Sequence, residues 1–570
     1  MQTSSPAYDH TELITRNGMV VAQHPEAARI GAQVLERGGN AVDAAVAAAF
    51  ATGVLLPLSN GIGGGGLMAI RLPDGSTASV DYGMITGENA SPDMFEYEDR
   101  LETPSPDAHR MSSRFAAPAV KGHENVQGYK SISTPGTVAG LSTALERFGA
   151  FELADVIAPA ADLAGNGFPM PFSLTLAILG ARKLLSRFPA SRALFLPDGY
   201  PASPGQKFQL PEYARSLLLI AKNGPDVFYR GELAERMVED IRANGGILTA
   251  ADFAAYEPLV YDCTLDGEYR GHTLHGVPGA NGCSLTIEAL QILQRFDIAD
   301  LSRDSVEYLH LLIECFKLAN VDRFTYLGDV AITGSPMEAL VHPGFAAERA
   351  KLISTATAGD YGAGDPWPYS KHSRPKKFAP PAGVSFDSGT THLTVVDKDR
   401  MAVSLTQTNV GFSGVVIGGV GAMMNNAMRW PEMLPGTVNS IYPRARCVHN
   451  MSPLVVQREG RLWGALGSSG GRRISTGVAQ SLVNVIEFGM SLQDAVQAPR
   501  VHVETDDVLM DGRLGNEIQS GLEALGHTVH VATPDFVSAQ FSTPNGVRVA
   551  GEDLVSGIYP VNKFGGAAGY

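Results

Sequence analysis

The sequence predicts an α+β protein, because helical and strand-like patterns occupy separate stretches of the 570-residue chain. Helical patterns dominate residues 135–330, whereas two β-branched runs at 390–397 and 401–408 flank a short polar turn and predict a β-hairpin. A chain of this length would ordinarily divide into several domains, but we find no convincing linker and no internal repeat. We therefore expect a single intertwined unit.

Composition and charge indicate a globular protein and argue against two kinds of partner. The chain is 44% hydrophobic and 18% charged, and its formal net charge is −15. Without a basic cluster to neutralise a row of phosphates, it is not expected to bind nucleic acid. The long apolar run 41–58 contains Asp43 and leads into Pro57, so it predicts a buried helix, not a membrane span.

The cysteines and the N-terminal residues indicate in which cellular compartment the protein is expected. Cys263, Cys283, Cys315 and Cys447 are widely spaced and form no C-x-x-C pair, which disfavours a disulfide framework or a zinc site and fits a reducing compartment. Residues 1–10 lack the basic and apolar regions of a signal peptide. We therefore expect a cytoplasmic protein.

The N-terminal part contains a glycine-rich loop that does not fit a nucleotide site. Residues 25–55 predict two helices that are broken at Gly38-Gly39, with Asn40 capping the second. Residues 61–66 match G-x-G-x-x-G, but this run follows a helix and precedes the strand-like run 67–72. A dinucleotide loop needs the reverse order, so a close-packed backbone crossing is predicted instead.

The hairpin brings threonine hydroxyls together at its open end. If Lys398 and Asp399 form a two-residue loop, Thr390 lies opposite Gln407, and one more loop residue sets it opposite Thr408. A threonine hydroxyl needs a base to act as a nucleophile, and the α-amino group of Thr390 becomes one if the chain is cut before it. The alternative is that this segment is only the start of a strand. After the hairpin, residues 409–421 predict a tight loop and a buried strand.

A second candidate nucleophile lies downstream. Residues 467–471 match the G-x-S-x-G elbow, with a strand-like run before them and a helix-like run after them. Asp511 and His527 follow, so Ser469 would have triad partners in the order Ser, Asp, His. An α/β-hydrolase also needs several βα units before the elbow, whereas the chain upstream shows a helical block and a hairpin. Ser469 is therefore the less favoured nucleophile.

Several motifs, taken in chain order, resemble those of the gamma-glutamyltransferase (glutathione hydrolase) family. They lie at 38–45, 63–68, 133–140, 390–397, 425–426, 451–453 and 467–471. The resemblance implies an N-terminal-nucleophile hydrolase folded as a four-layer αββα sandwich. It also implies self-cleavage between Gly389 and Thr390, which would give a large chain 1–389 and a small chain 390–570. Residues 355–389, rich in glycine and proline, would form the flexible end of the large chain.

The resemblance also implies a division of roles within the active site. Thr390 would be the catalytic nucleophile, and Thr408 would hydrogen-bond its hydroxyl. Gly470 and Gly471 turn into a helix, so their N–H groups are suited to hold the oxyanion of a tetrahedral intermediate. The alternative for these glycines is an ordinary strand–helix turn. This chemistry calls for no metal and no organic cofactor.

The substrate-binding positions depart from the family pattern. An arginine of the family corresponds here to Gly83, and a glutamine and an aspartate correspond to Ala427 and Trp430. A serine pair is replaced by His449-Asn450. Without these groups, the carboxylate and ammonium of a gamma-glutamyl substrate lose their partners. The candidate substrate-binding residues are instead Asn409, Arg429, Trp430, His449, Asn450 and Arg472, although Trp430 and His449 also suit a packed core.

We therefore predict an amidohydrolase that cleaves a small-molecule amide and is not specific for gamma-glutamyl groups. Relatives with altered head-group binding include cephalosporin acylases and an oxamate amidohydrolase. A genuine glutathione hydrolase or gamma-glutamyl transpeptidase is the main alternative. An uncleaved, inactive homologue that acts as a binding protein is another. The sequence does not indicate an oligomeric state.

Overall fold

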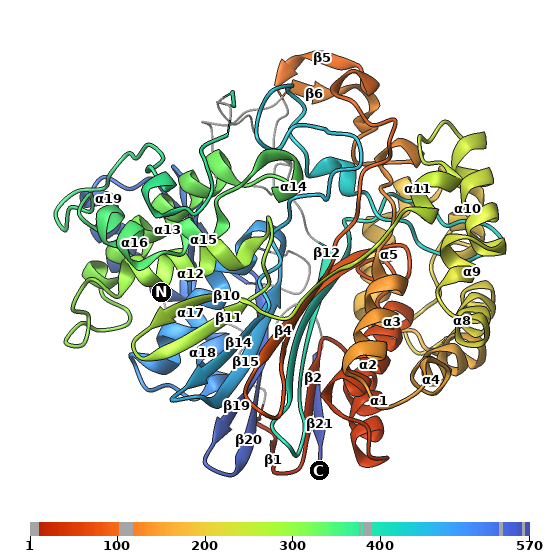
Figure 1. Ribbon diagram of the computed structural model, residues 1–570, viewed down its shortest axis with the longest axis horizontal. Coiled ribbons are helices and arrows are strands. Elements are labelled where there is room, and N and C mark those ends of the chain that lie inside the picture. Colours follow the sequence, from red (N-terminus) through yellow and green to blue (C-terminus); the bar gives the residue numbers. More distant parts are fainter. Residues whose placement is uncertain (1–10, 102–117, 376–377, 380–388, 535–539, 561–564) are drawn as a thin grey trace.

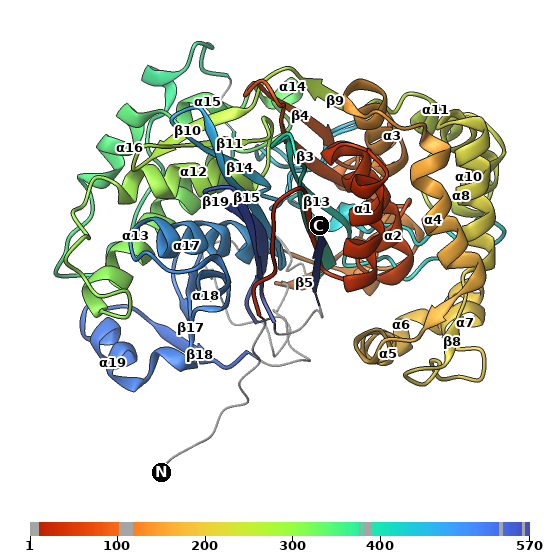
Figure 2. The same ribbon diagram turned by 90° about the horizontal axis from the view of Figure 1, so that it is seen from below.

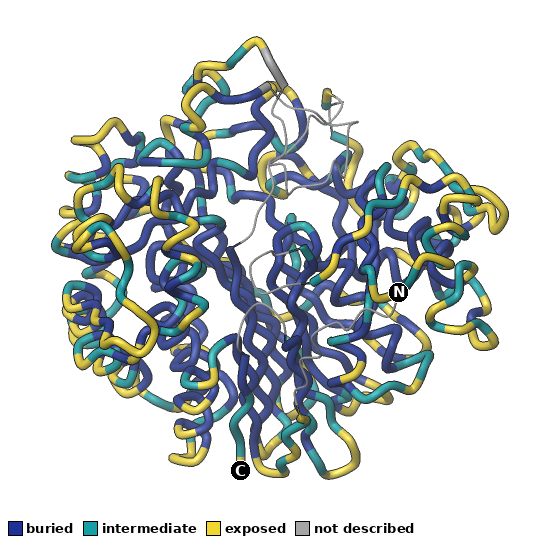
Figure 3. Tube along the Cα trace, turned by 180° about the vertical axis from the view of Figure 1, so that it is seen from behind, coloured by how far each residue is buried: buried dark blue, intermediate teal, exposed yellow. Residues whose placement is uncertain are grey.

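The computed structural model describes residues 11–101, 118–375, 378–379, 389–534, 540–560 and 565–570. Two seven-stranded sheets face each other, and helices cover the outer face of each (Figures 1 and 2). The strands cross the buried centre of the molecule, and the exposed residues lie mainly on the outer helices and loops (Figure 3). This is the predicted α+β, four-layer αββα arrangement.

The first sheet is built around the predicted hairpin. Each adjacent pair is antiparallel. Its strand order is β21 (Gly566–Gly569), β2 (Met19–Ala22), β12 (Gly389–Val396), β13 (Ala402–Val410), β3 (Gly65–Arg71), β4 (Thr77–Tyr82) and β9 (Leu259–Tyr261). In the hairpin, Val396 pairs with Ala402 and Thr391 with Gln407, which is the longer-loop register of the two predicted. The register shifts by a bulge at the open end, between Gly389 and Thr391.

The second sheet is also antiparallel throughout. Its order is β1 (Ile14–Thr15), β20 (Asp553–Ile558), β19 (Thr543–Ala550), β15 (Arg461–Ser469), β14 (Leu454–Arg458), β11 (His272–Gly276) and β10 (Leu265–Tyr269). Both sheets therefore contain strands from before and after Gly389. A small third sheet comprises β16 (Val501–Val503), β17 (Val508–Asp511) and β18 (Val529–Ala532).

One helical layer covers the first sheet. It includes α1 (Pro25–Glu36), α2 (Ala41–Leu55), α3 (Thr137–Phe148), α4 (Leu153–Asn166), α8 (Pro211–Asn223) and α10 (Glu232–Ala243). The Asn40 side chain accepts hydrogen bonds from the N–H groups of Val42 and Asp43, which confirms the predicted cap. Helix α2 is buried along its whole length, and its small alanine side chains allow close packing.

The other helical layer covers the second sheet. It includes α12 (Gly282–Leu293), α13 (Val306–Tyr326), α16 (Pro343–Ala350), α17 (Ile474–Ile486), α18 (Leu492–Gln497) and α19 (Asn516–Ala524). Shorter elements lie around these layers: α5 (Phe172–Gly180), α6 (Arg182–Leu185), α7 (Pro189–Phe195), α9 (Asp226–Tyr229), α11 (Ala250–Ala254), α14 (Val330–Thr333), α15 (Met337–Leu340), β5 (Tyr97–Leu101), β6 (Pro118–Val120), β7 (Phe168–Pro169) and β8 (Lys207–Phe208). Within the described ranges, no helix combines the length and apolarity needed to cross a bilayer.

The glycine-rich loop 61–66 packs directly against other backbone. A Cβ on Gly63 would overlap the carbonyl oxygen of Met423, and one on Gly64 would overlap that of Thr408. The loop is therefore a close-packed crossing, as predicted, and it leaves no space for a nucleotide at these positions.

The prediction of a buried strand within 409–421 is wrong. After the end of β13, residues 411–421 form turns and irregular structure, and Val416 makes only an isolated bridge to Met423. Val410 and Phe412 adopt φ values of 65° and 64°, and Gly414 also has a positive φ. These left-handed residues interrupt the extended conformation that a strand requires.

Candidate active site

Thr390 and Thr408 lie together at the open end of the hairpin. The Thr390 hydroxyl donates to the Thr408 hydroxyl over 3.1 Å. The Thr408 hydroxyl in turn donates to the carbonyl oxygen of Gly389 and accepts from the Val410 N–H over 2.7 Å. Both threonines are buried. One hydroxyl thus touches both the candidate nucleophile and the carbonyl of the peptide bond before it.

Position 389 has room only for glycine. A Cβ on residue 389 would overlap the carbonyl oxygen of Val410 and lie 3.3 Å from the Cα of Gly411. The absence of a side chain lets β12 approach β13 closely at the bulge. Gly389 therefore keeps its carbonyl within reach of the Thr408 hydroxyl.

His392 is a buried residue of this site that the sequence analysis did not single out. Its Nδ1 lies 2.8 Å from the Thr406 hydroxyl, and its Nε2 lies 3.1 Å from the Thr394 hydroxyl. The ring fills the space left by Gly467 of β15. Burial lowers the pKa of His392 to about 3, so the ring is neutral at ordinary pH. His392 lies two residues after Thr390, and alternate residues of a strand share one face. This spacing is the sequence signal that could have identified His392.

The predicted oxyanion glycines form the turn between β15 and α17. Gly470 has φ = 129° and Gly471 has φ = 61°, conformations that favour glycine. A Cβ on Gly470 would lie 2.6 Å from the Cα of Ser542. The turn is therefore defined both by its backbone conformation and by its tight contact with Ser542.

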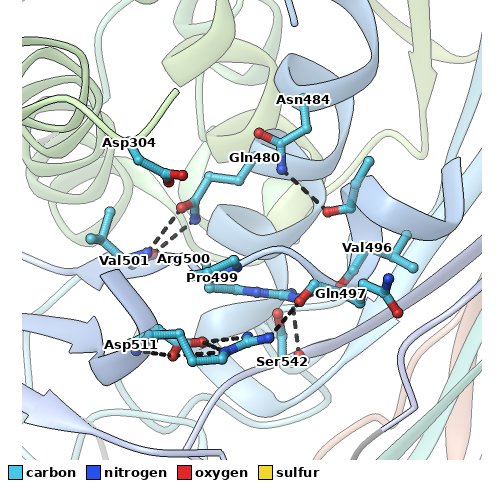
Figure 4. Close-up of polar contacts among 12 residues, drawn as sticks. Asp304, Gln480, Asn484, Val496, Gln497, Pro499, Arg500, Val501, Asp511 and Ser542 are labelled. Atoms are coloured by element: carbon cyan, nitrogen blue, oxygen red, sulfur yellow. Dashed lines mark hydrogen bonds and ion pairs between the residues drawn. The ribbon is translucent and has the colours of Figure 1, made fainter. Parts of the chain in front are cut away.

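Ser542, which packs against Gly470, also belongs to a buried polar network (Figure 4). The Arg500 guanidinium donates to the carbonyl oxygen of Ser542 over 3.4 Å and to that of Val496. Arg500 Nη1 also lies 3.5 Å from the position of a Cβ on Gly477, in the first turns of α17. Nearby, the Gln480 side chain bonds both the N–H and the carbonyl of Val501. These contacts hold together the segments that surround the glycine turn.

The structure does not assemble the alternative serine triad. Ser469 is buried and its hydroxyl accepts from the Gln23 amide over 2.6 Å. His527 Nε2 is 2.8 Å from His310 Nδ1, and the Asp511 carboxylate pairs with Arg513. The antiparallel sheets also contradict an α/β-hydrolase fold, whose sheet is mainly parallel.

Several predicted substrate-binding residues gather beside the hairpin. The rings of Trp430 and His449 are 5.7 Å apart. Trp430 packs in a cluster with Val410, the residue that pairs with Gly389. Trp430, Asn450 and Arg472 line the same cavity, and Arg472 Nε pairs with the buried Glu504 over 3.0 Å.

Arg429 and Asn409 occupy different places. Arg429 Nη1 lies 2.7 Å from the position that a Cβ would take on Gly411. Gly411 packs against Gly389 across the hairpin. The Asn409 amide instead donates to the carbonyl oxygen of Pro57 over 3.3 Å. Its side chain thus contacts the loop that follows α2. The structure thus does not bring Asn409 together with the other candidates.

A second cavity, of about 230 Å³, lies near Gly83, the position aligned with the family arginine. Asp81, Arg446 and His449 line this cavity and also surround the site of a Cβ on Gly83. Arg446 pairs with Asp81 over 3.3 Å. Burial lowers the pKa of His449 to about 4, so this side chain is neutral at ordinary pH.

Two further polar residues organise the site and were not predicted. The Asn425 side chain donates to the carbonyl oxygens of Gly63 and Ser133 and accepts from the Ser133 N–H. It thereby joins three of the motifs noted in the sequence. Arg323 of α13 donates to the Asn450 side chain. Its position in a buried helix gave no sequence signal for this contact.

Comparisons with known proteins identify the family of the chain. The family model described as gamma-glutamyltranspeptidase matches residues 27–562. An acylase ACY 1 proenzyme from Pseudomonas sp. (strain SE83) is 37% identical over 517 residues, covering 90% of this chain and 87% of the relative. A glutathione hydrolase proenzyme from Escherichia coli (strain K12) is 34% identical over 532 residues, covering 90% of this chain and 86% of the relative.

The solved structure of a cephalosporin acylase from Bacillus halodurans has a similar fold. It superposes with a TM-score of 0.84 at 25% identity, covering 100% of this chain and 99% of that one. Family match, relatives and fold agree along nearly the whole chain. The chain therefore belongs to the gamma-glutamyltranspeptidase family and has the fold of N-terminal-nucleophile hydrolases.

Proposed function

We propose that this protein is an autoprocessing threonine amidohydrolase that cleaves a small-molecule amide through an acyl-Thr390 intermediate. The observation that carries the proposal is the hydrogen-bonded chain from the Thr390 hydroxyl through Thr408 to the Gly389 carbonyl. The candidate nucleophile, a hydroxyl donor and the carbonyl of the preceding peptide bond follow one another in this chain of contacts, which supports the proposal. Two of the relatives reported above are named proenzymes, which supports a precursor form.

Self-cleavage begins at the bond between Gly389 and Thr390. The Thr390 oxygen attacks the Gly389 carbonyl carbon, and the Thr408 hydroxyl stabilises the negative charge that develops on the carbonyl oxygen. The C–N bond breaks as the nitrogen of Thr390 takes up the proton that the Thr390 hydroxyl has lost, which leaves an ester. Water hydrolyses this ester to give chain 1–389 and chain 390–570, and the second chain starts with a free amine.

Turnover uses that amine as the base. The Thr390 amine accepts the hydroxyl proton while the oxygen attacks the substrate amide, and it later protonates the leaving amine. The N–H groups of Gly470 and Gly471 stabilise the oxyanion. Water then releases the acyl group and regenerates Thr390. The positive end of the α17 dipole adds to the stabilisation of negative charge at this turn.

The acyl group is proposed not to be gamma-glutamyl. Gly83 and Trp430 stand where the family supplies an arginine and an aspartate, so the α-carboxylate and α-ammonium lack those partners. Both acylases and glutathione hydrolases are among the relatives, so a genuine glutathione hydrolase is the second candidate. Hydrolysis of a gamma-glutamyl anilide at rates matching those of other amides would favour that second candidate.

The nucleophile is tested by comparing Thr390→Ala, Thr390→Ser and Ser469→Ala. Thr390→Ala should run as one uncut band in denaturing electrophoresis and hydrolyse no amide, whereas Thr390→Ser keeps a hydroxyl and should still be processed. Ser469→Ala should yield two bands and retain turnover. Mass spectrometry should place the new N-terminus at Thr390. Loss of turnover in Ser469→Ala alone would reject the threonine mechanism.

A further inference from the structure

The two sheets carry different parts of the proposed active site. Thr390 lies at the start of β12 in the first sheet, whereas Gly470 and Gly471 follow the end of β15 in the second. Among the described strands, none pairs across the two sheets, so side-chain contacts set the separation between them. A substrate carbonyl has to reach the Thr390 oxygen and the glycine N–H groups together, and a misplacement of about 1 Å can slow catalysis about 100-fold.

Gln23 makes a contact between the sheets beside the glycine turn. It directly follows β2, which pairs with β12 in the first sheet. Its side-chain amide donates to the Ser469 hydroxyl over 2.6 Å and to the Thr543 hydroxyl over 2.7 Å. Ser469 and Thr543 are paired residues of β15 and β19 in the second sheet, and their hydroxyl oxygens lie 2.6 Å apart. One buried amide thus joins the two sheets.

Both hydroxyls that accept from Gln23 belong to residues next to the glycine turn. Ser469 directly precedes Gly470, and Thr543 directly follows Ser542. Ser542 is the residue whose backbone packs against Gly470. Gln23 therefore contacts both the residue from which the turn starts and the segment on which the turn rests.

On the side of the first sheet, Gln23 lies beside the strand that carries the nucleophile. The pairing of β2 with β12 reaches Leu393, and one further step in the same register brings Gln23 opposite His392. His392 also contacts the second sheet, because its carbonyl oxygen accepts from the Asn545 amide over 3.2 Å. The two sheets are thus joined by polar contacts close to Thr390.

The Gln23 amide carries a cost that stability alone does not explain. Its Oε1 is buried and accepts no hydrogen bond from the part of the chain that the structure describes. A buried acceptor without a donor destabilises the folded state, and an apolar side chain of the same length would avoid this. The two N–H bonds are kept in spite of that cost, which favours a role in positioning.

We infer that Gln23 is a positioning residue that sets the distance between Thr390 and the turn at Gly470 and Gly471. This inference rests on the proposed function. Gln23 touches no reacting atom and acts through Ser469 and Thr543. Without its bonds the turn shifts relative to Thr390, which weakens oxyanion stabilisation during turnover. Self-cleavage is spared, because its oxyanion forms at the Gly389 carbonyl.

The test compares Gln23→Met with the matched control Gln457→Met. Gln457 of β14 also bonds across the sheets, to the Gly75 carbonyl oxygen over 3.0 Å, but it lies at the opposite end of β15 from Ser469. The substrate is the fastest of the acetyl, pentanoyl and gamma-glutamyl 4-nitroanilides. Gln23→Met should lower kcat about 10- to 100-fold with KM within about threefold, whereas Gln457→Met should keep kcat within about twofold. Both variants should still be cut at the wild-type rate.

Variants of Thr543 check that the effect passes through this contact. Thr543→Ser keeps the hydroxyl and should have a kcat within about threefold of wild type, whereas Thr543→Val should lower kcat. In the double variant, Thr543→Val should lower kcat no further than Gln23→Met alone, because both changes break the same bond. Ser469→Ala leaves the bond between Gln23 and Thr543 and should retain turnover.

Failure of this inference differs from failure of the proposed function. If wild type is cut and active but Gln23→Met and Gln457→Met have equal kcat, Gln23 only stabilises the fold and the inference is wrong. Independent, additive effects of Gln23→Met and Thr543→Val would also overturn it. An uncut wild-type chain, or turnover by Thr390→Ala, would instead reject the threonine mechanism and this inference with it.

Discussion

The Thr408 hydroxyl connects the two reactions proposed for Thr390. Before cleavage it lies between the Thr390 hydroxyl and the Gly389 carbonyl, and its own position is fixed by the Val410 N–H. After cleavage Gly389 is no longer bonded to Thr390, but the contact between the hydroxyls of Thr390 and Thr408 can persist. One side chain can therefore serve both the self-cleavage and the later turnover.

Replacing Thr408 with valine should slow self-cleavage about 10²- to 10³-fold, because the shape is kept but the donor to the developing oxyanion is lost. The fraction of cut chain over time, read by denaturing electrophoresis, measures this effect. Thr408→Ser keeps the hydroxyl and should be cut at a rate within about tenfold of wild type. Equal processing of the valine and wild-type proteins would remove Thr408 from the mechanism.

A buried cluster on α13 shows how other ionisable residues are used structurally. His310, Glu314 and His527 are ligand types that suit a metal ion, and all three are buried. The Lys317 ammonium already occupies this group, 2.9 Å from Glu314 and 3.4 Å from His527. The cluster therefore holds an internal cation, and it anchors residues 354–361 through contacts with Ser354 and Gly359.

At the scale of elements, sequence patterns predicted what depends on local chemistry. The Asn40 cap, the hairpin and the strand-like run 67–72 all follow from short-range signals, and the structure contains each of them. The strand expected within 409–421 failed because positive φ at Val410 and Phe412 is set by tertiary packing. Hydrophobicity does not report that conformation.

The candidate site was predictable where it lies on one element and not where distant segments meet. The neighbouring hydroxyls of Thr390 and Thr408 follow from hairpin register alone. The contact between Arg323 and Asn450 joins residues 127 positions apart, and the network at Arg500 joins α18, β16 and the start of β19. Periodicity within one segment carries no information about such contacts.

Arg500 is expected to act as a positioning residue for the glycine turn. Replacing it with methionine removes the bonds to Ser542 and Val496 and should let the turn shift, lowering kcat about 10- to 100-fold with KM little changed. Steady-state kinetics with an anilide that the wild-type enzyme hydrolyses measures both kcat and KM. Self-cleavage should continue, because its oxyanion forms at Gly389. A variant with lower Tm and unchanged kcat would show that Arg500 only stabilises the fold.

At the scale of the whole molecule, buried neutral histidines couple stability to pH. Burial lowers the pKa of His392 from 6.5 to about 3 and that of His449 to about 4. Below about pH 6.5 these histidines are protonated in the unfolded chain but not in the folded one. The unfolded state then binds more protons, so stability falls as pH decreases through this window.

We expect the Tm to fall between pH 7 and pH 5, with each such histidine contributing about 1.4 kcal/mol per pH unit below its unfolded pKa. Thermal unfolding followed by circular dichroism measures the trend. His392→Gln retains hydrogen-bonding capacity without titrating, so its Tm should depend less on pH than that of wild type. Parallel curves for the two proteins would contradict this assignment.

Each sheet contains strands from both sides of Gly389, and this has a consequence for refolding after the proposed cleavage. A severed protein has no half that can complete its own core. The intact precursor folds as a single molecule, at a rate that does not depend on how much protein is present. The severed form must first bring two partners together, so dilution should hinder its renaturation while leaving that of the precursor unaffected.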